Sequence, residues 1–369
     1  MAVLYRKYRP HNFSEIVGRD HIKKTLKNAI LMKMVSHAYL FYGQRGTGKT
    51  TIARLLAKAI NCEKRKETEF EPCLKCQSCI EISKGNAMDL IEIDAASNRG
   101  IDQIRDLKEG INIVPTRSKY KVYIIDECHM LTKEASNALL KTLEEPPGHV
   151  IFVLCTTEYA KVIPTISSRC QRFEFKKINL RQIVDKLSLI CKKEKVKAQI
   201  EALELISQNA DGSFRDAESL LDEVINAEDK EITKNEVEDI LGIVGVVPIS
   251  QMVDFLAKKD KKETLEHIGK IMESGMDIEN FSKKLISYLH DLLLIKINPD
   301  LLGKGEIIFT KEEIDNLKNQ EKYFSESQLK NMIKKFILAC QQIKLSNFPQ
   351  LSIEIAAIEA IDALNKETE

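Results

Sequence analysis

The stretch HAYLFYGQRGTGKTTIARLLAKAI (residues 37–60) decides the fold of this chain. It starts with a nearly continuous apolar run, which is typical of a strand buried on both faces of a parallel sheet. It ends with the apolar spacing of an amphipathic helix. Between them, residues 43–50 (GQRGTGKT) fit the pattern G-x-x-x-x-G-K-[ST], in which backbone N–H groups surround phosphates at a helix N-terminus. The stretch therefore predicts a phosphate-binding loop in an α/β fold.

Two side chains of this loop have expected chemical roles. Lys49 is expected to reach the β- and γ-phosphates of a nucleotide, and the Thr50 hydroxyl is expected to ligate Mg²⁺. A glycine-rich loop can match the pattern by chance. The strand before this loop and the helix after it argue against a chance match, so we expect a nucleoside triphosphate with Mg²⁺ here.

A second apolar run, KVYIIDECH (121–129), leads into two acidic residues. Asp126 is expected at the carboxyl edge of a neighbouring strand, where Mg²⁺ coordination needs a carboxylate. Glu127 comes next and can orient and polarise an attacking water. The alternative interpretation is a strand that ends in solvated acids, and the intact phosphate loop argues against it.

Three further candidates rest on weaker patterns. Thr156 and Thr157 close the run VIFVLCTT and can place a hydroxyl near the γ-phosphate, although threonine is common at strand ends. Arg169 in TISSRCQRF and Arg215 in DGSFRDAES are candidate electrophilic groups. An isolated arginine is usually a surface residue, so spacing alone does not assign these two.

Apolar runs and helical segments alternate through about residue 175. The runs predict four buried strands, at residues 37–43, 89–95, 121–127 and 150–157. From about Asn179 the strand pattern disappears and helical spacing continues to the C-terminus. The predicted domains are an α/β domain over 1–178, a small helical domain over 179–242 and a helical domain over 243–369.

The composition describes a globular chain with balanced charge. Its 369 residues exceed one ordinary domain, so two or three domains are expected. The 56 Lys+Arg and 55 Asp+Glu residues give a net charge of +1, so any contact with nucleic acid must come from local patches or from assembly. No signal core and no run of about 20 apolar residues is present, so we expect a cytoplasmic protein without a membrane partner.

Four of the nine cysteines lie within eighteen residues and follow C-x10-C-x2-C-x2-C. They are Cys62, Cys73, Cys76 and Cys79. In a reducing cytoplasm, clustered cysteines indicate metal or redox chemistry before disulfides. Four thiolates can complete a tetrahedral Zn²⁺ site with no open position, so we expect structural zinc in a module over about residues 62–79. Redox or disulfide use is the alternative.

Together these motifs resemble the bacterial DNA polymerase III gamma/tau subunit, the motor of the replicative sliding-clamp loader. The match is dense from residue 1 to about 225 and thin over the C-terminal third. The stretches that carry it are YRKYRPHNFSEIVGRDHI (5–22), residues 37–62, the cysteine cluster, residues 89–98, residues 121–158, TISSRCQRFEF (165–175) and DGSFRDAESLLD (211–222). The family fold is AAA+: an α/β P-loop ATPase domain with a zinc-binding insert, a small helical lid, and an all-α collar that joins subunits in a pentameric ring.

The resemblance implies ATP as the nucleotide and a role for each motif residue. Lys49 and Thr50 belong to its first nucleotide motif, and Asp126 and Glu127 to its second. Thr157 falls where the family senses the γ-phosphate. Arg215 matches a lid arginine that contacts phosphate in cis, and Arg169 matches a finger that reaches the neighbouring subunit's ATP. Further nucleotide contacts are expected at Tyr5, Arg9, Pro10, Val17, Gly18, Gly43, Arg45, Gly46, Thr47, Gly48 and Thr51.

The same resemblance implies the function and the partners. ATP binding and hydrolysis would open a sliding clamp and load it on primer–template DNA. The partners would be the other clamp-loader subunits, namely delta, delta-prime and further gamma/tau copies. Arg99 and Gly100 precede a helical stretch and are candidate DNA contacts, whereas an ordinary solvated arginine is the alternative. Longer members of the family continue into further domains, so this sequence is expected to be a short form or a piece of a longer chain.

Three other functions compete with this reading. The tetrapeptide D-E-C-H is also found in translocating helicases, but these need a second motor domain that the helical C-terminal half does not offer. A non-hydrolysing scaffold like the delta-prime subunit lacks a competent phosphate loop. A branch-migration ATPase needs a C-terminal winged-helix domain, and no such pattern follows Gly245.

Overall fold

The structure is a computed structural model, and the residues that it describes are 3–97, 110–227, 231–241, 246–298, 311–343, 346 and 348–366. Residues 1–193 and 209–222 form one unit, and residues 194–208 and 223–369 form another. The candidate DNA contacts Arg99 and Gly100 lie outside the described residues. Within these described ranges, no helix is both long enough and apolar enough to span a bilayer.

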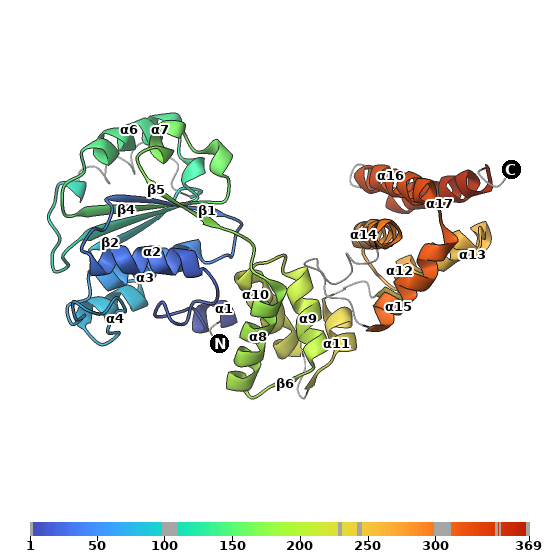
Figure 1. The fold of residues 1–369 in the computed structure, drawn as a ribbon, viewed down its shortest axis with the longest axis horizontal. Helices are drawn as coiled ribbons and strands as arrows, with labels where there is room; N and C mark the ends of the chain where they lie inside the picture. The colour runs from blue at the N-terminus through green and yellow to red at the C-terminus, as the bar shows by residue number, and fades with distance from the viewer. Residues whose placement is uncertain are drawn as a thin grey trace. The chain divides into compact units, whose positions relative to one another are not determined.

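The first unit contains a five-stranded parallel sheet with the strand order β2-β3-β4-β1-β5. Its strands are β1 (Ala38–Gly43), β2 (Leu90–Asp94), β3 (Lys121–Asp126), β4 (Val150–Thr156) and β5 (Gln171–Phe175). Helices α2 (Asp20–Leu31) and α3 (Lys49–Ile60) cover one face, and α6 (Lys133–Glu144) and α7 (Pro164–Ser167) cover the other (Figure 1). This is a three-layer α/β arrangement.

The four predicted strands are present, and β5 is a fifth that the sequence patterns missed. Strand β5 pairs only with β1, at the edge of the sheet, and exposed and buried residues are mixed along it. It therefore lacks the continuous apolar run of a central strand. Strand β2 forms the other edge and is only partly buried, so the expectation of burial on both faces was wrong for this strand.

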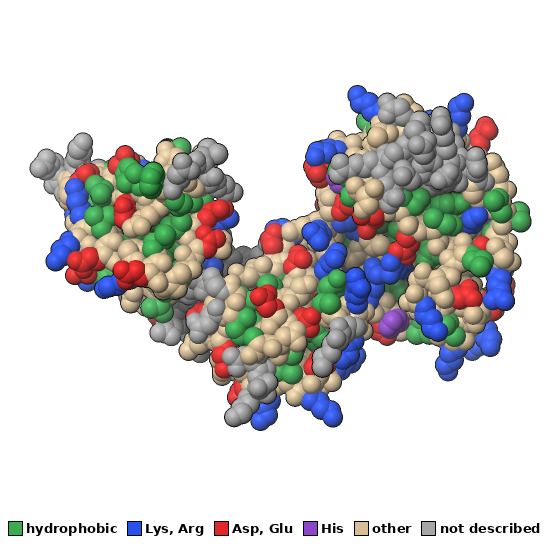
Figure 2. Space-filling model, turned by 180° about the vertical axis from the view of Figure 1, so that it is seen from behind, with side chains coloured by type: hydrophobic (Ala, Val, Ile, Leu, Met, Phe, Trp, Pro, Cys, Tyr) green, Lys and Arg blue, Asp and Glu red, His purple; other side chains and the backbone are tan. Residues whose placement is uncertain are grey.

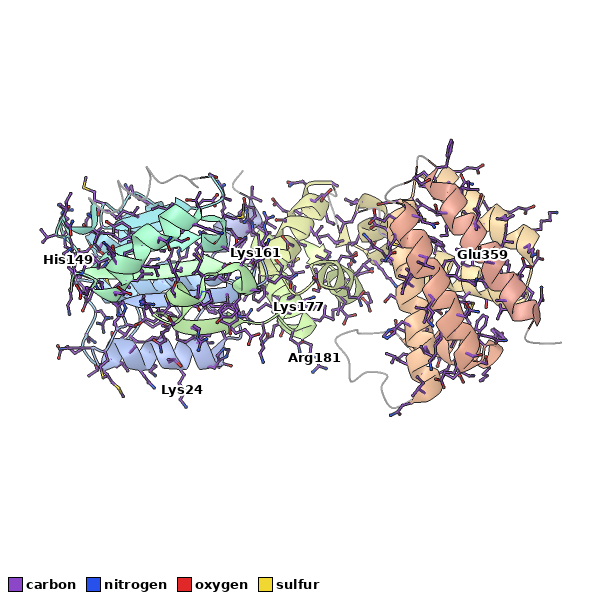
Figure 3. All side chains as sticks on the ribbon, turned by 90° about the horizontal axis from the view of Figure 1, so that it is seen from above. Lys24, His149, Lys161, Lys177, Arg181 and Glu359 are labelled. Carbon is purple, nitrogen blue, oxygen red and sulfur yellow. The ribbon has the colours of Figure 1, made fainter. Side chains whose placement is uncertain are left out.

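Each helix of this unit has an apolar stripe that faces the sheet. Helix α2 buries Ile22, Leu26 and Ile30, while Lys24 points away from the sheet (Figure 3). Helix α6 begins after Thr132, whose side chain accepts a hydrogen bond from the Ala135 N–H and caps the helix. It ends at Glu144, before the two prolines that cannot continue it.

Two apolar clusters, one on each face of the sheet, stabilise the first unit. The cluster under α2 and α3 contains Leu26, Tyr39, Phe41, Leu56 and Val153. The cluster under α6 and α7 contains Leu40, Tyr123, Leu139, Phe152 and Ile166. Because successive residues of a strand point to opposite faces, neighbours such as Leu40 and Phe41 belong to different clusters. Short or peripheral elements complete the unit: α1 (Leu4–Lys7), α4 (Gln77–Lys84), η1 (Cys128–Met130), η2 (Tyr159–Lys161), nearly all of α8 (Leu180–Glu194) and residues 214–222 of α10 (Phe214–Ala227).

The second unit is mainly helical. Its only described strands are the two-residue pair β6 (Lys197–Ala198) and β7 (Glu231–Ile232). Its helices are α9 (Ile200–Asn209), α11 (Lys234–Ile240), α12 (Val246–Ala257), α13 (Lys261–Glu273), α14 (Ile278–Ile297), α15 (Lys311–Gln320), η4 (Glu321–Tyr323), α16 (Glu326–Ile343) and α17 (Pro349–Lys366). One cluster that includes Phe281, Leu289 and Phe336 joins α12 to α17.

Figure 2 shows basic and acidic side chains interspersed over the face in view, as a net charge of +1 leads us to expect.

We predict that Phe152→Ala destabilises the first unit by about 3–5 kcal/mol, because it leaves a cavity beneath α6 and α7. Phe152 is fully buried in β4 and stacks on Tyr123 with a centroid distance of 5.5 Å. Thermal denaturation measures the effect. Met88→Ala is the control, since Met88 is 78% exposed. Equal shifts of the melting temperature in the two variants would contradict this description of the core.

Candidate functional site

The loop between β1 and α3 has the backbone of a phosphate-binding loop. Gly43, Gly46 and Gly48 all have positive φ angles, and the Lys49 ammonium donates hydrogen bonds to the carbonyl oxygens of Gly43 (2.7 Å) and Gln44 (2.9 Å). Lys49 is 6% exposed, and burial lowers the pKa of its ammonium group. The lysine is thus held inside the loop with little solvent around its charge.

Two glycines of the loop are required by close packing. A Cβ atom on Gly43 would lie 2.2 Å from the carbonyl oxygen of Phe175, at the end of β5. A Cβ atom on Gly46 would lie 1.9 Å from the Ser213 hydroxyl oxygen, directly before α10. Because no side chain fits at such distances, the loop touches β5 and the start of α10 through its backbone.

The two predicted metal ligands are in contact. The Thr50 hydroxyl donates a hydrogen bond of 2.8 Å to Oδ2 of Asp126, and Oδ1 of Asp126 accepts one of 3.0 Å from the Glu127 N–H. Thr50 is in the first turn of α3 and Asp126 is the last residue of β3. A hydroxyl and a carboxylate are the oxygen donors that Mg²⁺ prefers, so this pair fits a magnesium site.

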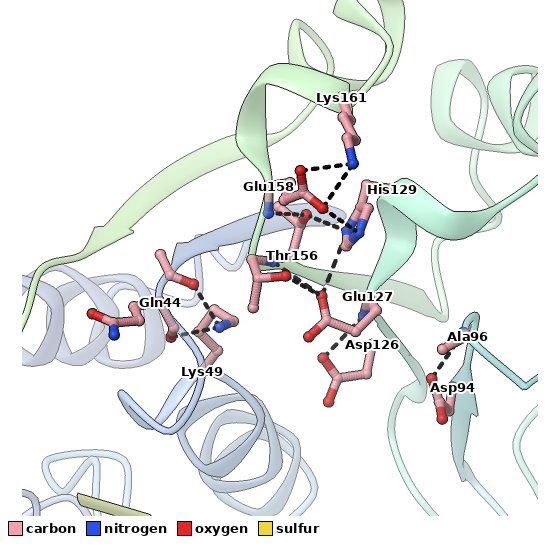
Figure 4. Close-up of polar contacts among 12 residues, drawn as sticks. Gln44, Lys49, Asp94, Ala96, Asp126, Glu127, His129, Thr156, Glu158 and Lys161 are labelled. Carbon is pink, nitrogen blue, oxygen red and sulfur yellow. Dashed lines mark hydrogen bonds and ion pairs between the residues drawn. The ribbon is translucent and has the colours of Figure 1, made fainter. Parts of the chain in front are cut away.

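Glu127 is held by the end of β4 (Figure 4). Its Oε2 atom accepts two hydrogen bonds from Thr157, one from the backbone N–H (3.1 Å) and one from the hydroxyl (2.8 Å). Glu127 has the left-handed backbone conformation (φ 48°), which directs the chain from β3 into η1. Among the described residues, no partner contacts Oε1, so this oxygen is available to a bound water.

His129 connects Glu127 to a second acidic residue. A hydrogen bond of 2.9 Å joins its Nδ1 atom to the Thr156 hydroxyl, and the same nitrogen lies 3.5 Å from Oε2 of Glu127. On the other side of the ring, Nε2 lies 3.4 Å from Glu158, which pairs with Lys161 (Figure 4). No role was predicted for His129 from the sequence. The D-E-C-H spacing was the available signal, because it places the histidine two residues after Glu127.

A cavity of about 1030 Å³ lies next to these groups. It is lined by the N-terminal segment, the phosphate loop, the end of β3 and the first turns of α10. The predicted residues that line it are Tyr5, Arg9, Pro10, Val17, Arg45, Gly46, Thr47, Gly48, Lys49, Thr50, Thr51, Asp126, Glu127 and Arg215. Gly18, Gly43, Thr157 and Arg169 were also predicted, but they are not part of its lining.

Two arginines of the cavity wall come from distant parts of the chain. The guanidinium carbon of Arg215, on α10, lies 4.9 Å from the ring centroid of Tyr5. Arg9 donates a hydrogen bond of 3.2 Å from Nε to the Thr51 hydroxyl, and burial lowers the pKa of its guanidinium group to about 10. The structure therefore brings the N-terminal segment and α10 to the phosphate loop.

Arg169 lies elsewhere, at the end of α7. Its guanidinium group forms an ion pair with Glu144 and donates a hydrogen bond of 2.7 Å to the carbonyl oxygen of Thr165. It contacts no residue of the phosphate loop in the described part of its own chain.

Nine charged residues that line the cavity were not predicted from the sequence, and Arg19, Lys186 and Glu218 are three of them. Arg19 donates to the carbonyl oxygens of Thr47 (3.3 Å) and Lys176, and Lys186 comes from α8. No local pattern marks either residue. Glu218 is the third, and its spacing from Arg215 was the signal, since residues three apart on a helix share a face.

The four clustered cysteines converge between α3 and α4. The Sγ atoms of Cys62, Cys73, Cys76 and Cys79 all lie within 4.8 Å of one another. Tetrahedral zinc with bonds of about 2.3 Å places sulfur atoms about 3.8 Å apart, which this group approaches. Backbone N–H groups also point at the sulfurs, at 3.2 Å from Cys73 to Cys62 Sγ and at 3.3 Å from Cys76 to Cys73 Sγ. The donor set therefore fits a closed zinc site.

The strand order, the phosphate loop after β1 and the paired acids after β3 together define an AAA+ P-loop ATPase domain. The comparisons with known families extend this assignment over nearly the whole chain. Residues 18–179 match the family described as DNA polymerase III, delta subunit. Residues 182–229 match the clamp-loader ATPase lid domain, and residues 232–369 match domain III of DNA polymerase III subunits gamma and tau.

Individual relatives support the same family assignment. The chain is 35% identical to the DNA polymerase III subunit gamma of Buchnera aphidicola (subsp. Schizaphis graminum), over 99% of both chains. It is 44% identical to the subunit tau of Bacillus subtilis over 96% of this chain, but it spans only 62% of that relative's length. A solved branch-migration motor from Thermotoga maritima aligns with 68% of this chain and 79% of its own, with a TM-score of 0.47 and 17% identity. The chain belongs to the DNA polymerase III gamma/tau family.

We predict that Gly46→Ala abolishes nucleotide binding, because the new methyl group would overlap Ser213 and the φ of 73° is strained for alanine. Calorimetric titration with Mg²⁺ and ATP measures the loss. Gly148→Ala is the matched control, because open space surrounds that position. Retention of wild-type affinity by Gly46→Ala would show that the loop and the start of α10 separate freely.

Proposed function

We propose that this chain is an ATP-driven motor subunit of a sliding-clamp loader, which opens the clamp and loads it on primer–template DNA. Membership of the gamma/tau family and the intact nucleotide site support the proposal. The observation that carries the ATPase part is the hydrogen bond between Thr50 and Asp126, beside the buried Lys49. This hydrogen bond joins the two nucleotide motifs, and both of its residues line the cavity of about 1030 Å³.

The side chains divide the chemistry of hydrolysis among them. Lys49 would neutralise the β- and γ-phosphates, and the N–H groups of residues 46–50 would hold them in the loop. Thr50 and Asp126 would hold Mg²⁺, which neutralises charge on the phosphate oxygens when bound. Glu127 would orient the attacking water through Oε1, the oxygen that its contacts with Thr157 leave available.

We propose further that Thr157 couples Glu127 to the γ-phosphate. A hydroxyl group has one proton to donate, and Thr157 donates it here to Oε2 of Glu127. A γ-phosphate within reach would compete for that proton. Donation to the phosphate would remove one of the two Thr157 hydrogen bonds that hold Glu127, so the base would be held less tightly when substrate is present.

The two further arginines would act from different chains. Arg215 lines the cavity and would contact phosphate in cis. Arg169 lies away from its own phosphate loop, which supports an action in trans on the ATP of a neighbouring subunit. An arginine that neutralises charge in the transition state contributes orders of magnitude to the rate. An isolated chain should therefore be a poor ATPase.

We also propose functional domains over 1–178, 179–242 and 243–369, for the ATPase, lid and collar. The collar would join this chain to delta, delta-prime and further gamma/tau copies in a cytoplasmic pentameric ring. The apolar cluster that links α12 to α17 supports a stable helical domain there. Structural zinc bound by the four cysteines would fold the polar stretch between Cys62 and Cys73, which cannot form a core of its own.

We predict that ATP turnover by the assembled loader rises when the clamp and primer–template are added, and that Lys49→Ala in this chain removes the rise. The physical reason is loss of the only buried ammonium that the loop contributes to the phosphates. Lys24→Ala is the control, on the exposed face of α2. Turnover that is unaffected by Lys49→Ala would assign hydrolysis to other subunits and make this chain a scaffold.

We predict one zinc ion per chain by elemental analysis, lost in Cys76→Ser and retained in Cys340→Ser, whose thiol lies outside the cluster. Removal of zinc by a chelator should increase hydrogen exchange over residues 62–79 while ATP binding survives, because the cysteines do not line the nucleotide cavity. Complete loss of nucleotide affinity on chelation would contradict a purely structural role.

A further inference from the structure

Glu218 is a buried acid in the nucleotide cavity for which the proposed hydrolysis has no use. It lies on α10, three residues after Arg215, and both residues line the cavity. Glu218 is 6% exposed. Among the described residues, none forms a hydrogen bond or an ion pair with its carboxyl group. An unpartnered acid at such burial is costly unless it is neutral or finds a partner in a ligand.

The charges around Glu218 do not compensate its burial. Desolvation raises the pKa of its carboxyl group to about 7, and Lys186 on α8 acts in the opposite direction. The Lys186 ammonium already donates a hydrogen bond of 3.2 Å to the carbonyl oxygen of Tyr8. The other titratable groups that line the same cavity include Tyr5, Arg6, Arg9, His11, Glu15 and Arg215.

The direction of α10 indicates which part of a nucleotide Glu218 faces. The helix begins at Phe214, next to Ser213, which packs against Gly46 of the phosphate loop. Glu218 is five residues beyond Ser213, or about 7.5 Å along a helix that rises 1.5 Å per residue. Arg215 lies between them on α10. Glu218 therefore lies farther along α10 from the phosphate loop than Arg215 does, and Lys186, which acts on its charge, contacts Tyr8 of the N-terminal segment. We place the nucleoside of a bound nucleotide on this side of the cavity.

The chemistry of a neutral carboxyl group matches adenine. The base presents an amino donor beside a ring-nitrogen acceptor, and a protonated carboxyl group offers a carbonyl acceptor beside a hydroxyl donor. An ionised carboxylate has acceptors only and would face the ring nitrogen with a lone pair. We infer that protonated Glu218 pairs with the base edge of adenine, so that ATP binding takes up a proton at this residue. This inference rests on the proposed function, because it takes ATP as the nucleotide.

The first experiment compares the wild type with Glu218→Gln, using the full chain and a non-hydrolysable ATP analogue. The amide keeps one acceptor and one donor but does not ionise. If binding requires the protonated form of Glu218, the affinity for the ATP analogue is fully present below pH 7. It then falls as the pH rises through 7. From pH 6 to pH 8 the wild type should therefore lose about tenfold more affinity than the variant. The phosphates and His11 are common to both proteins, so the ratio of the two affinities isolates Glu218.

Glu223→Gln is the matched control, because it makes the same change at an exposed position of α10. It should follow the wild-type pH dependence. A ratio of wild-type to Glu218→Gln affinity that stays constant from pH 6 to pH 8 would overturn the inference.

A second experiment separates the base from the ribose. Purine riboside triphosphate lacks the amino group of ATP, and 2′-deoxy-ATP lacks a ribose hydroxyl. Loss of the amino group should weaken binding several-fold more in the wild type than in Glu218→Leu, whereas loss of the hydroxyl should weaken both proteins equally. If loss of the ribose hydroxyl weakened binding more in the wild type than in Glu218→Leu, and loss of the amino group weakened both equally, the ribose would lie at Glu218 and the inference would be overturned. Failure of the proposed function would give another result than failure of this inference. The wild type would then bind no ATP at any pH, or Lys49→Ala would bind ATP as tightly as the wild type does.

Discussion

The parallel register of β1, β3 and β4 is the constraint on which the nucleotide site depends. Tyr42 is opposite Thr156, and Ile125 is opposite Leu154. Since parallel strands all end at the same edge of a sheet, the loop after β1, the acids at the end of β3 and the threonines at the end of β4 meet there. A slip of β3 by one residue would turn its side chains to the opposite face and separate Asp126 from Thr50. The apolar clusters on both faces of the sheet oppose such a slip.

The parts of the fold that the sequence predicts are those with a strong local pattern. The central strands are continuous apolar runs, and the phosphate loop is a contiguous motif, so both were recognisable. The edge strands β2 and β5 are partly exposed, and for β5 the resulting mixture of polar and apolar residues concealed the strand. The contact of Gly46 with Ser213 joins residues far apart in sequence, and no local pattern encodes it. Arg19 and Lys186 escaped prediction for the same reason.

The net charge of +1 conceals a strongly uneven distribution around the site. Ten Lys and Arg side chains line the nucleotide cavity, but only five Asp and Glu side chains do. A triphosphate therefore meets a positive environment although the whole chain is almost neutral. Burial reinforces this effect, because the charges of Lys49 and Arg9 are only weakly screened by water. Within the same wall, an acid such as Glu218 stands out as an exception that needs its own explanation.

Arg169, which we propose to act on a neighbouring subunit, is held in its own chain by weak surface contacts. Its contacts with Glu144 and with the Thr165 carbonyl oxygen are made at the surface, where the two charged side chains remain 33% and 48% exposed. Exposed pairs of this kind stabilise a protein by about 0–1 kcal/mol, because water solvates the separated partners almost as well. If Arg169 acts on a neighbouring chain as proposed, exchanging Glu144 for a phosphate there would cost little free energy. Until such a neighbour is present, Glu144 and the Thr165 carbonyl oxygen keep the guanidinium group in an ordered position.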